Sequence, residues 1–133
     1  MNAAAIADAA AQVERLATDL DVDVEWSDTA SAVAWRRKRR IRCGPIRGQV
    51  SYLTALHELG HIAIRPEPPL RLSQEAAAWR WALAQSREDP TRATWRRILA
   101  YLDAYAARVE RRPGMIRPPD FDAFHAEIAR AAG

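Results

Sequence analysis

The segment His57-Glu58-Leu59-Gly60-His61 combines the residue types that a catalytic metal site requires. Two histidines four positions apart on a helix lie about one turn apart, so both imidazoles project from one face and can bind one ion. Zinc is the natural candidate, because imidazole suits it and a catalytic zinc site uses three protein ligands and a water. Glu58 points about 100° further round the helix, where it would act as general base.

The alternative is a chance HExxH pattern whose histidines belong to the core or the surface. The surrounding helix argues for a site, because it is apolar almost all round and buried polar groups without partners would each cost about 1–3 kcal/mol or more. Gly60 costs the helix about 1 kcal/mol relative to alanine, and the close approach of another backbone or of a substrate would explain that loss. The sequence therefore predicts metal binding.

The third ligand is to be sought downstream of His61. A metzincin would need glycine at position 64 and histidine at position 67, and the chain has Ile64 and Glu67; a thermolysin-like Asn-Glu-x-x-Ser-Asp segment is also absent. Glu75 shares a predicted helix face with Trp79 and other apolar residues, where a carboxylate is costly unless it meets a cation. We favour Glu75 as the ligand. Two alternatives stay open: Glu75 complements the helix dipole, or Glu67 is the ligand.

The run "TALHELGHI" followed by "EAAAWRWAL" resembles the ImmA/IrrE-type zinc metallopeptidases, especially their short versions from phages and mobile elements of actinobacteria. The resemblance covers about residues 20–85. It implies that His57, His61 and Glu75 are zinc ligands, that Glu58 is the catalytic acid/base, and that the substrate is a regulatory protein such as a repressor or an antitoxin. The chain lacks the family's Leu-Met-Pro-like stretch and a helix-turn-helix extension, and residues 90–133 match nothing in it.

The elements before this helix predict a small sheet. Residues 2–20 show helical spacing of apolar residues. Residues 21–26, 31–35 and 39–43 alternate as half-buried strands do, and the last two form a hairpin that turns near Arg37 and Lys38. The predicted inner face of the hairpin holds Val33, Trp35, Ile41 and Cys43. We expect an antiparallel three-stranded sheet.

Helices account for the rest of the chain. Residues 49–64 predict a central buried helix, because their apolar residues cover nearly the whole circumference. Ser73 is the expected N-cap of a helix to about residue 86. Asp89 and Pro90 are the expected N-cap and first residue of a further helix, which Pro113-Gly114 ends. Pro118-Pro119-Asp120 opens the last one. The predicted fold is α+β and zincin-like: an N-terminal helix, the sheet, then a helical bundle carrying the HExxH helix in one domain, residues 1–133.

The densest run of charge lies in the predicted hairpin and consists of Arg36, Arg37, Lys38, Arg39, Arg40 and Arg42. The simplest interpretation is a solvated edge that resists aggregation. The run is also a candidate surface for an acidic protein or a nucleic acid. A third interpretation is that the edge strand receives an extended substrate by β-augmentation.

Several residues are weaker candidates for the site. His125 could stabilise an oxyanion or support a ligand, although a core histidine is the simpler interpretation. Partners of the ligating histidines could be Tyr101, Asp103 or Tyr105, because such a histidine usually donates its other N–H to a carboxylate or carbonyl. A Cys43 thiolate is a remote alternative ligand. Trp79 and Trp81 project in opposite directions, so at most one lines the site.

Composition limits the cellular compartment and the kinds of partner that we expect. The chain has 133 residues, 49% hydrophobic and 28% charged, with a net charge of +3 and a pI near 9.6. That balance permits a nucleic-acid partner without requiring one. The lone cysteine fits a reducing compartment, and no stretch predicts a signal peptide or a bilayer-spanning helix, so we expect a cytoplasmic monomer. Two functions follow: a zinc endopeptidase, or a catalytically silent module that binds DNA or a regulator through the arginine hairpin.

Overall fold

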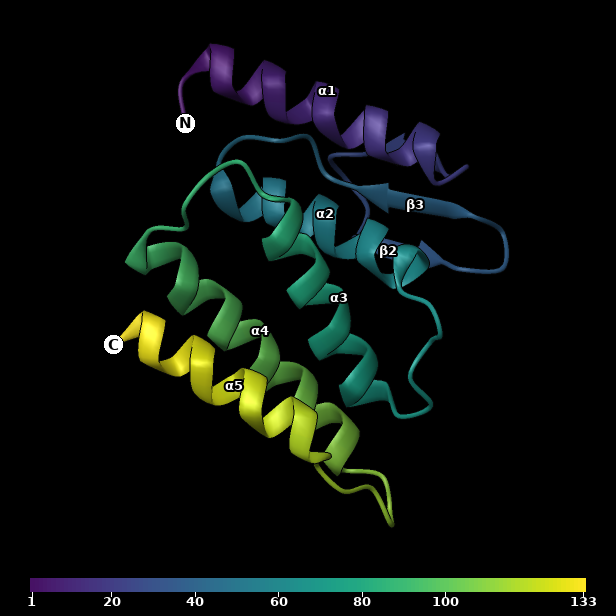
Figure 1. The fold of residues 1–133 in the computed structure, drawn as a ribbon, viewed down its shortest axis with the longest axis vertical. Helices are drawn as coiled ribbons and strands as arrows, with labels where there is room; N and C mark the ends of the chain where they lie inside the picture. Colours follow the sequence, from purple (N-terminus) through teal and green to yellow (C-terminus); the bar gives the residue numbers. More distant parts are fainter. The chain divides into compact units, whose positions relative to one another are not determined.

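The computed structural model describes residues 1–133 and divides them into two units. The first unit comprises residues 1–64 and 78–88, and the second comprises residues 65–77 and 89–133. Eight elements follow one another along the chain (Figure 1): α1 (Ala3–Asp19), β1 (Asp23–Trp26), β2 (Val33–Trp35), β3 (Arg40–Cys43), α2 (Gln49–Ala63), α3 (Arg71–Gln85), α4 (Arg92–Glu110) and α5 (Pro119–Ala132). The α+β class and the order of the elements are confirmed.

The sheet differs from the predicted antiparallel one. Its strand order is β1-β3-β2. β3 is antiparallel to β2, as the hairpin requires, but it is parallel to β1. Alternation of side chains reveals that a segment is a strand, whereas the direction of pairing depends on which edge the next strand joins. The sheet is therefore mixed.

The two strands of the hairpin do not share the predicted inner face. Ile41 and Cys43 are buried, as predicted. Trp35 lies opposite Arg40 in the register, and residues paired across strands share one face. Its ring accordingly contacts the guanidinium of Arg40 and that of Arg42, at 5.7 Å and 5.3 Å from the ring centroid. The prediction that Val33 and Trp35 face inward with Ile41 is wrong, because the register places both on the arginine face.

The central position of α2 in the first unit is confirmed. It packs against β2, β3 and α1, and its buried residues come from every side of the helix: Tyr52, Leu53, Ala55, Leu56, His57, Glu58, Leu59, Gly60 and Ile62. This is why the segment shows no single apolar stripe in the sequence.

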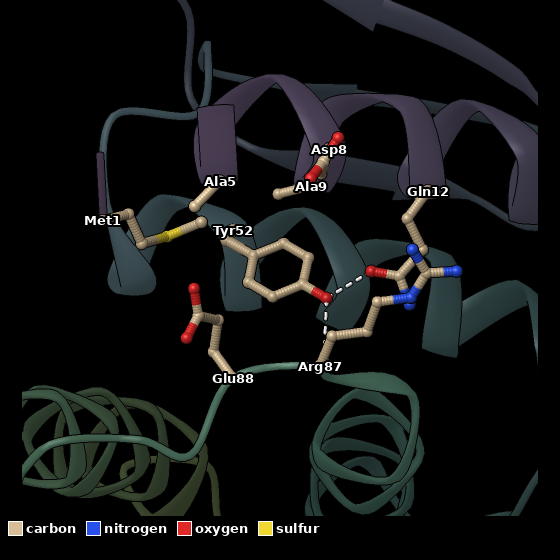
Figure 2. Close-up of a pocket in the computed structure, with 8 residues that line it drawn as sticks. All are labelled: Met1, Ala5, Asp8, Ala9, Gln12, Tyr52, Arg87 and Glu88. Atoms are coloured by element: carbon tan, nitrogen blue, oxygen red, sulfur yellow. Dashed lines mark hydrogen bonds between the residues drawn. The ribbon is translucent and has the colours of Figure 1, made fainter. Parts of the chain in front are cut away.

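A buried hydrogen-bond network ties α1 to α2 (Figure 2). The Tyr52 hydroxyl donates to Gln12 Oε1 and accepts from the backbone N–H of Arg87 at 3.1 Å, and Gln12 Nε2 donates to the Gln85 carbonyl at 2.7 Å. Gln12, Tyr52 and Arg87 line a cavity of about 150 Å³ together with Asp8 and Glu88. Because Tyr52 and Gln12 satisfy each other, the network serves packing of α1.

Two predicted helix starts are wrong. α3 begins at Arg71, so Ser73 lies within the helix, where its hydroxyl donates to Asp120 Oδ1 at 2.9 Å. α4 has Thr91 as N-cap, and the Thr91 side chain accepts from the N–H of Thr94 at 3.2 Å. Asp89-Pro90 precedes that cap. For α4, both Asp89 and Thr91 are residue types that cap helices, so local sequence does not rank them. For α3, the helix starts before its first capping-type residue, Ser73.

In the second unit, α4 and α5 form a helical hairpin and lie side by side (Figure 1). Apolar side chains from both helices are buried there: Ile98, Leu102, Val109, Phe121, Phe124 and Ile128. The last helix begins at Pro119 after the Pro118 N-cap, as predicted. None of the helices in the chain combines the length and the apolar character that crossing a bilayer would require.

Candidate metal centre

The two histidines of α2 present their ring nitrogens to each other. His57 Nε2 and His61 Nε2 lie 3.1 Å apart, with the rings at 76°. Nitrogens that bind one tetrahedral zinc at 2.0–2.1 Å are separated by about 3.3 Å. The spacing therefore fits two ligands of one ion. In the metal-free protein it also allows a hydrogen bond between one protonated and one unprotonated nitrogen.

A carboxylate from α3 joins the histidines. Ligand atoms of His57, His61 and Glu75 all lie within 4.8 Å of one another. Glu75 is one turn before Trp79 on the same continuous helix, and the Trp79 ring stacks on His57 with centroids 4.1 Å apart and planes at 23°. The stacked ring thus aligns the helix face that carries Glu75 with the histidines. These three residues could hold a metal ion.

Gly60 explains how α3 comes so close to α2. A Cβ atom at this position would lie 2.6 Å from the Ala78 carbonyl oxygen and 3.1 Å from its Cα. Real Cβ atoms essentially never lie as close as 2.6 Å to a backbone atom. The prediction that Gly60 permits a close backbone approach is confirmed, and the approaching backbone is the one that carries Trp79.

The charge of the site matches a divalent cation. His57, Glu58 and Glu75 are only 5%, 8% and 7% exposed. With neutral imidazoles the two carboxylates bring a formal charge of −2 into this buried setting, which is unfavourable unless cations or protons compensate it. Two imidazole nitrogens and one carboxylate oxygen are also a donor set found in catalytic zinc sites. The residues present therefore fit the ion that the sequence predicts.

Glu58 lies beside the ligand atoms without belonging to their group. Its Oε1 is 3.9 Å from His57 Nε2, so the carboxylate borders the space next to the ring nitrogens. Its negative charge also acts on the buried thiol of Cys43 in β3. Burial, and then the negative charges of Glu58 and Glu14, raise the pKa of the Cys43 thiol to about 12. Cys43 is thus a neutral thiol in the metal-free protein, and it is not among the residues that gather as ligands.

The other predicted site residues form contacts of their own. Glu67 is exposed and lies outside the ligand group. His125 Nε2 lies 2.6 Å from Asp103 Oδ1, which joins α5 to α4. The Arg97 guanidinium packs on the ring of Tyr101 and that of Arg108 on the ring of Tyr105. None of these residues belongs to the group that could hold a metal.

Four arginines of the predicted hairpin patch bind within the protein. Arg36 Nη1 donates to the carbonyls of His61 and Ile62 at 2.8 Å and 3.3 Å. Arg39 donates to the carbonyls of Leu20 and Asp21. Arg40 pairs with Glu25 at 3.4 Å, and Arg42 donates to the Ser31 carbonyl at 3.0 Å. Arg37 and Lys38 at the turn are exposed.

Two contacts of the site were missed in the sequence. The stacking of Trp79 on His57 had a usable signal, because Trp79 is one turn from Glu75 and thus on the ligand face. The bonds from Arg36 to the end of α2 had none, since they join residues 25 and 26 positions apart. Comparison with models of protein families, with curated proteins and with solved structures finds no match to this chain.

Proposed function

We propose that this protein is a zinc-dependent endopeptidase of the zincin type, with His57, His61 and Glu75 as ligands and Glu58 as general base. The observation that carries the proposal is the convergence of the three ligand atoms within 4.8 Å, beside a second buried acid, Glu58. Three protein ligands leave a position for water or substrate, which distinguishes a catalytic zinc site from a closed structural one.

The residues divide the chemistry between them. A bound Zn²⁺ ion supplies Lewis acidity, which polarises the scissile carbonyl and acidifies water. Glu58 takes a proton from the attacking water as the oxygen adds to the carbonyl carbon. It then gives that proton to the amine nitrogen when the C–N bond breaks, so that the products are a carboxylic acid and an amine, which end as carboxylate and ammonium after a further proton transfer. Trp79 holds the His57 ring in place by stacking.

The resemblance to the ImmA/IrrE-type peptidases supports a regulatory protein, such as a repressor or an antitoxin, as the substrate. The alternative function, a silent module binding DNA or a regulator through the hairpin, has less support. Four of the six basic residues of the hairpin already bind carbonyls, a carboxylate or the Trp35 ring. Only Arg37 and Lys38 at the turn are then left to bind an anionic partner.

The test combines metal content with cleavage. The purified chain should contain one zinc per molecule by elemental mass spectrometry and should cut a random peptide library read by mass spectrometry. Glu58→Gln should keep the zinc and lose cleavage, because an amide has no proton-accepting oxygen of comparable basicity. Glu75→Gln should weaken zinc binding.

Glu67→Gln is the matched control, since it removes an exposed carboxylate from the loop between α2 and α3. It should change neither zinc content nor cleavage. A chain that takes up no zinc, or a Glu58→Gln variant that cleaves as well as the unmodified chain, would contradict the proposed function.

A further inference from the structure

The C-terminal end of α2 has carbonyl groups that backbone hydrogen bonds within the helix do not satisfy. The helix ends at Ala63, and the N–H of Ile64 donates to Gly60 at 3.1 Å. Ile64 is then extended, with φ −66° and ψ 129°. Proline at position 66 has no N–H to offer the Ile62 carbonyl four residues earlier. The last turn, which carries His61, therefore depends on partners from elsewhere.

Arg36 supplies these partners from the turn between β2 and β3. Its Nη1 donates to the carbonyl of His61 at 2.8 Å and to that of Ile62 at 3.3 Å. Both bonds are charge-assisted, and the positive guanidinium stands at the negative end of the helix dipole. One side chain thus satisfies two consecutive carbonyls at the end of the helix.

We propose that Arg36 is a positioning residue for the metal centre, holding the last turn of α2 so that His61 stays in ligating position. The inference rests on the proposed metal site. His57 lies in the middle of α2 and is clamped by Trp79, whereas His61 is on the turn that would fray first. Arg36 binds the carbonyls of that turn directly.

The hairpin offers a matched pair of substitutions. Arg36→Met removes the guanidinium that holds the end of α2. Arg39→Met removes a guanidinium that makes the same kind of bonds to the carbonyls of Leu20 and Asp21, at the end of α1. Arg36→Lys keeps a charged donor and should rescue part of the effect. Zinc affinity is measured by competition with a chromophoric chelator, and stability by urea unfolding of the metal-free chain.

Arg36→Met should weaken zinc binding by about tenfold or more, the usual cost of losing support around a ligand. Arg39→Met should lower the stability while leaving zinc affinity unchanged. Arg36→Lys should fall between Arg36→Met and the unmodified chain. In the metal-free chain, Arg36→Met should also speed hydrogen exchange of the amides of residues 62–64, which reports fraying without requiring zinc or activity.

Unchanged zinc affinity in Arg36→Met would overturn the inference, as would equal losses of affinity in Arg36→Met and Arg39→Met, because both variants would then act through general stability. If Arg36→Met fails to fold, Arg36→Lys carries the test, and a lysine variant with unaltered affinity and exchange overturns the inference. Lack of zinc binding by the unmodified chain would instead contradict the proposed function, and the two failures are thereby distinguished.

Discussion

The two histidine environments of this protein show what turns an imidazole into a candidate metal ligand. On α2, His57 is buried, stacks on Trp79 and faces a second imidazole, and a carboxylate from α3 joins them. On α5, His125 faces the single carboxylate of Asp103, whose side chain is 58% exposed. A histidine beside an acid occurs in both, and only the first combines burial with three convergent ligand atoms.

The difference concerns desolvation. At the surface, water screens the pair of His125 and Asp103, so neither group needs a further partner. Around His57, the protein has largely removed water from two carboxylates and an imidazole, a cost that cations, protons or hydrogen bonds must offset. Buried polar groups that converge are therefore stronger evidence for a ligand than a histidine–acid contact.

The largest contrast should come from histidine substitutions. His57→Ala should abolish stoichiometric zinc binding, because it deletes a ligand and should cost more than the roughly 10- to 100-fold that loss of an outer partner costs. His125→Ala should leave zinc content unchanged. Elemental analysis after dialysis measures both, and equal zinc contents in the two variants would break the distinction between the environments.

Gly60→Ala should damage the buried environment next most severely. The added methyl group would meet the Ala78 carbonyl at 2.6 Å, and such overpacking costs about 1–3 kcal/mol. Urea unfolding of the metal-free chain should show the loss, and zinc binding should weaken because α3 moves away from α2. Gly48→Ala is the control, since nothing lies within 4 Å of its Cβ position; equal stability of the two variants would contradict the close packing.

The Cys43 thiol should make the stability of the buried environment fall at alkaline pH. Its pKa is raised from 9.0 to about 12 in the folded metal-free chain. Between these values the unfolded thiol loses its proton while the folded one keeps it, so rising pH favours unfolding. The free energy of unfolding should fall by about 1 kcal/mol between pH 9 and pH 10. Well below pH 9 the thiol is protonated in both states, and the full stability is retained.

Cys43→Ala should remove that part of the pH dependence, as measured by urea unfolding across the range. The native thiol should also resist alkylation until the chain unfolds, because it is buried and protonated. Rapid labelling of the folded chain would show that this side of the site is open to solvent.

Asp103→Asn should have the smallest effect. A largely exposed pair contributes about 0.2–1 kcal/mol, and its loss should be smaller still at high salt. Unfolding in urea at low and high salt gives the value, with zinc content as a second readout. A change in zinc content would show that the environment of His125 is coupled to the metal ligands.

Features that depend on residues close in sequence could be predicted, and features that depend on strand pairing could not. The turn of the helix places His57 and His61 together, and the apolar circumference of residues 49–64 identifies a buried helix, so both could be predicted. The parallel pairing of β1 with β3 and the outward face of Trp35 could not. They depend on strand order and register, which alternation of side chains leaves open.

The sequence by itself determined the α+β class, the helix that carries the histidines and the identity of the ligand candidates, because these depend on contacts within a turn or two. Only the tertiary structure decided that Glu75, and not Glu67, joins His57 and His61. It also decided that Arg36 binds the end of α2 instead of facing solvent. Both depend on long-range packing, since the Gly60 contact with Ala78 and the fold of the hairpin bring together residues that local patterns do not connect.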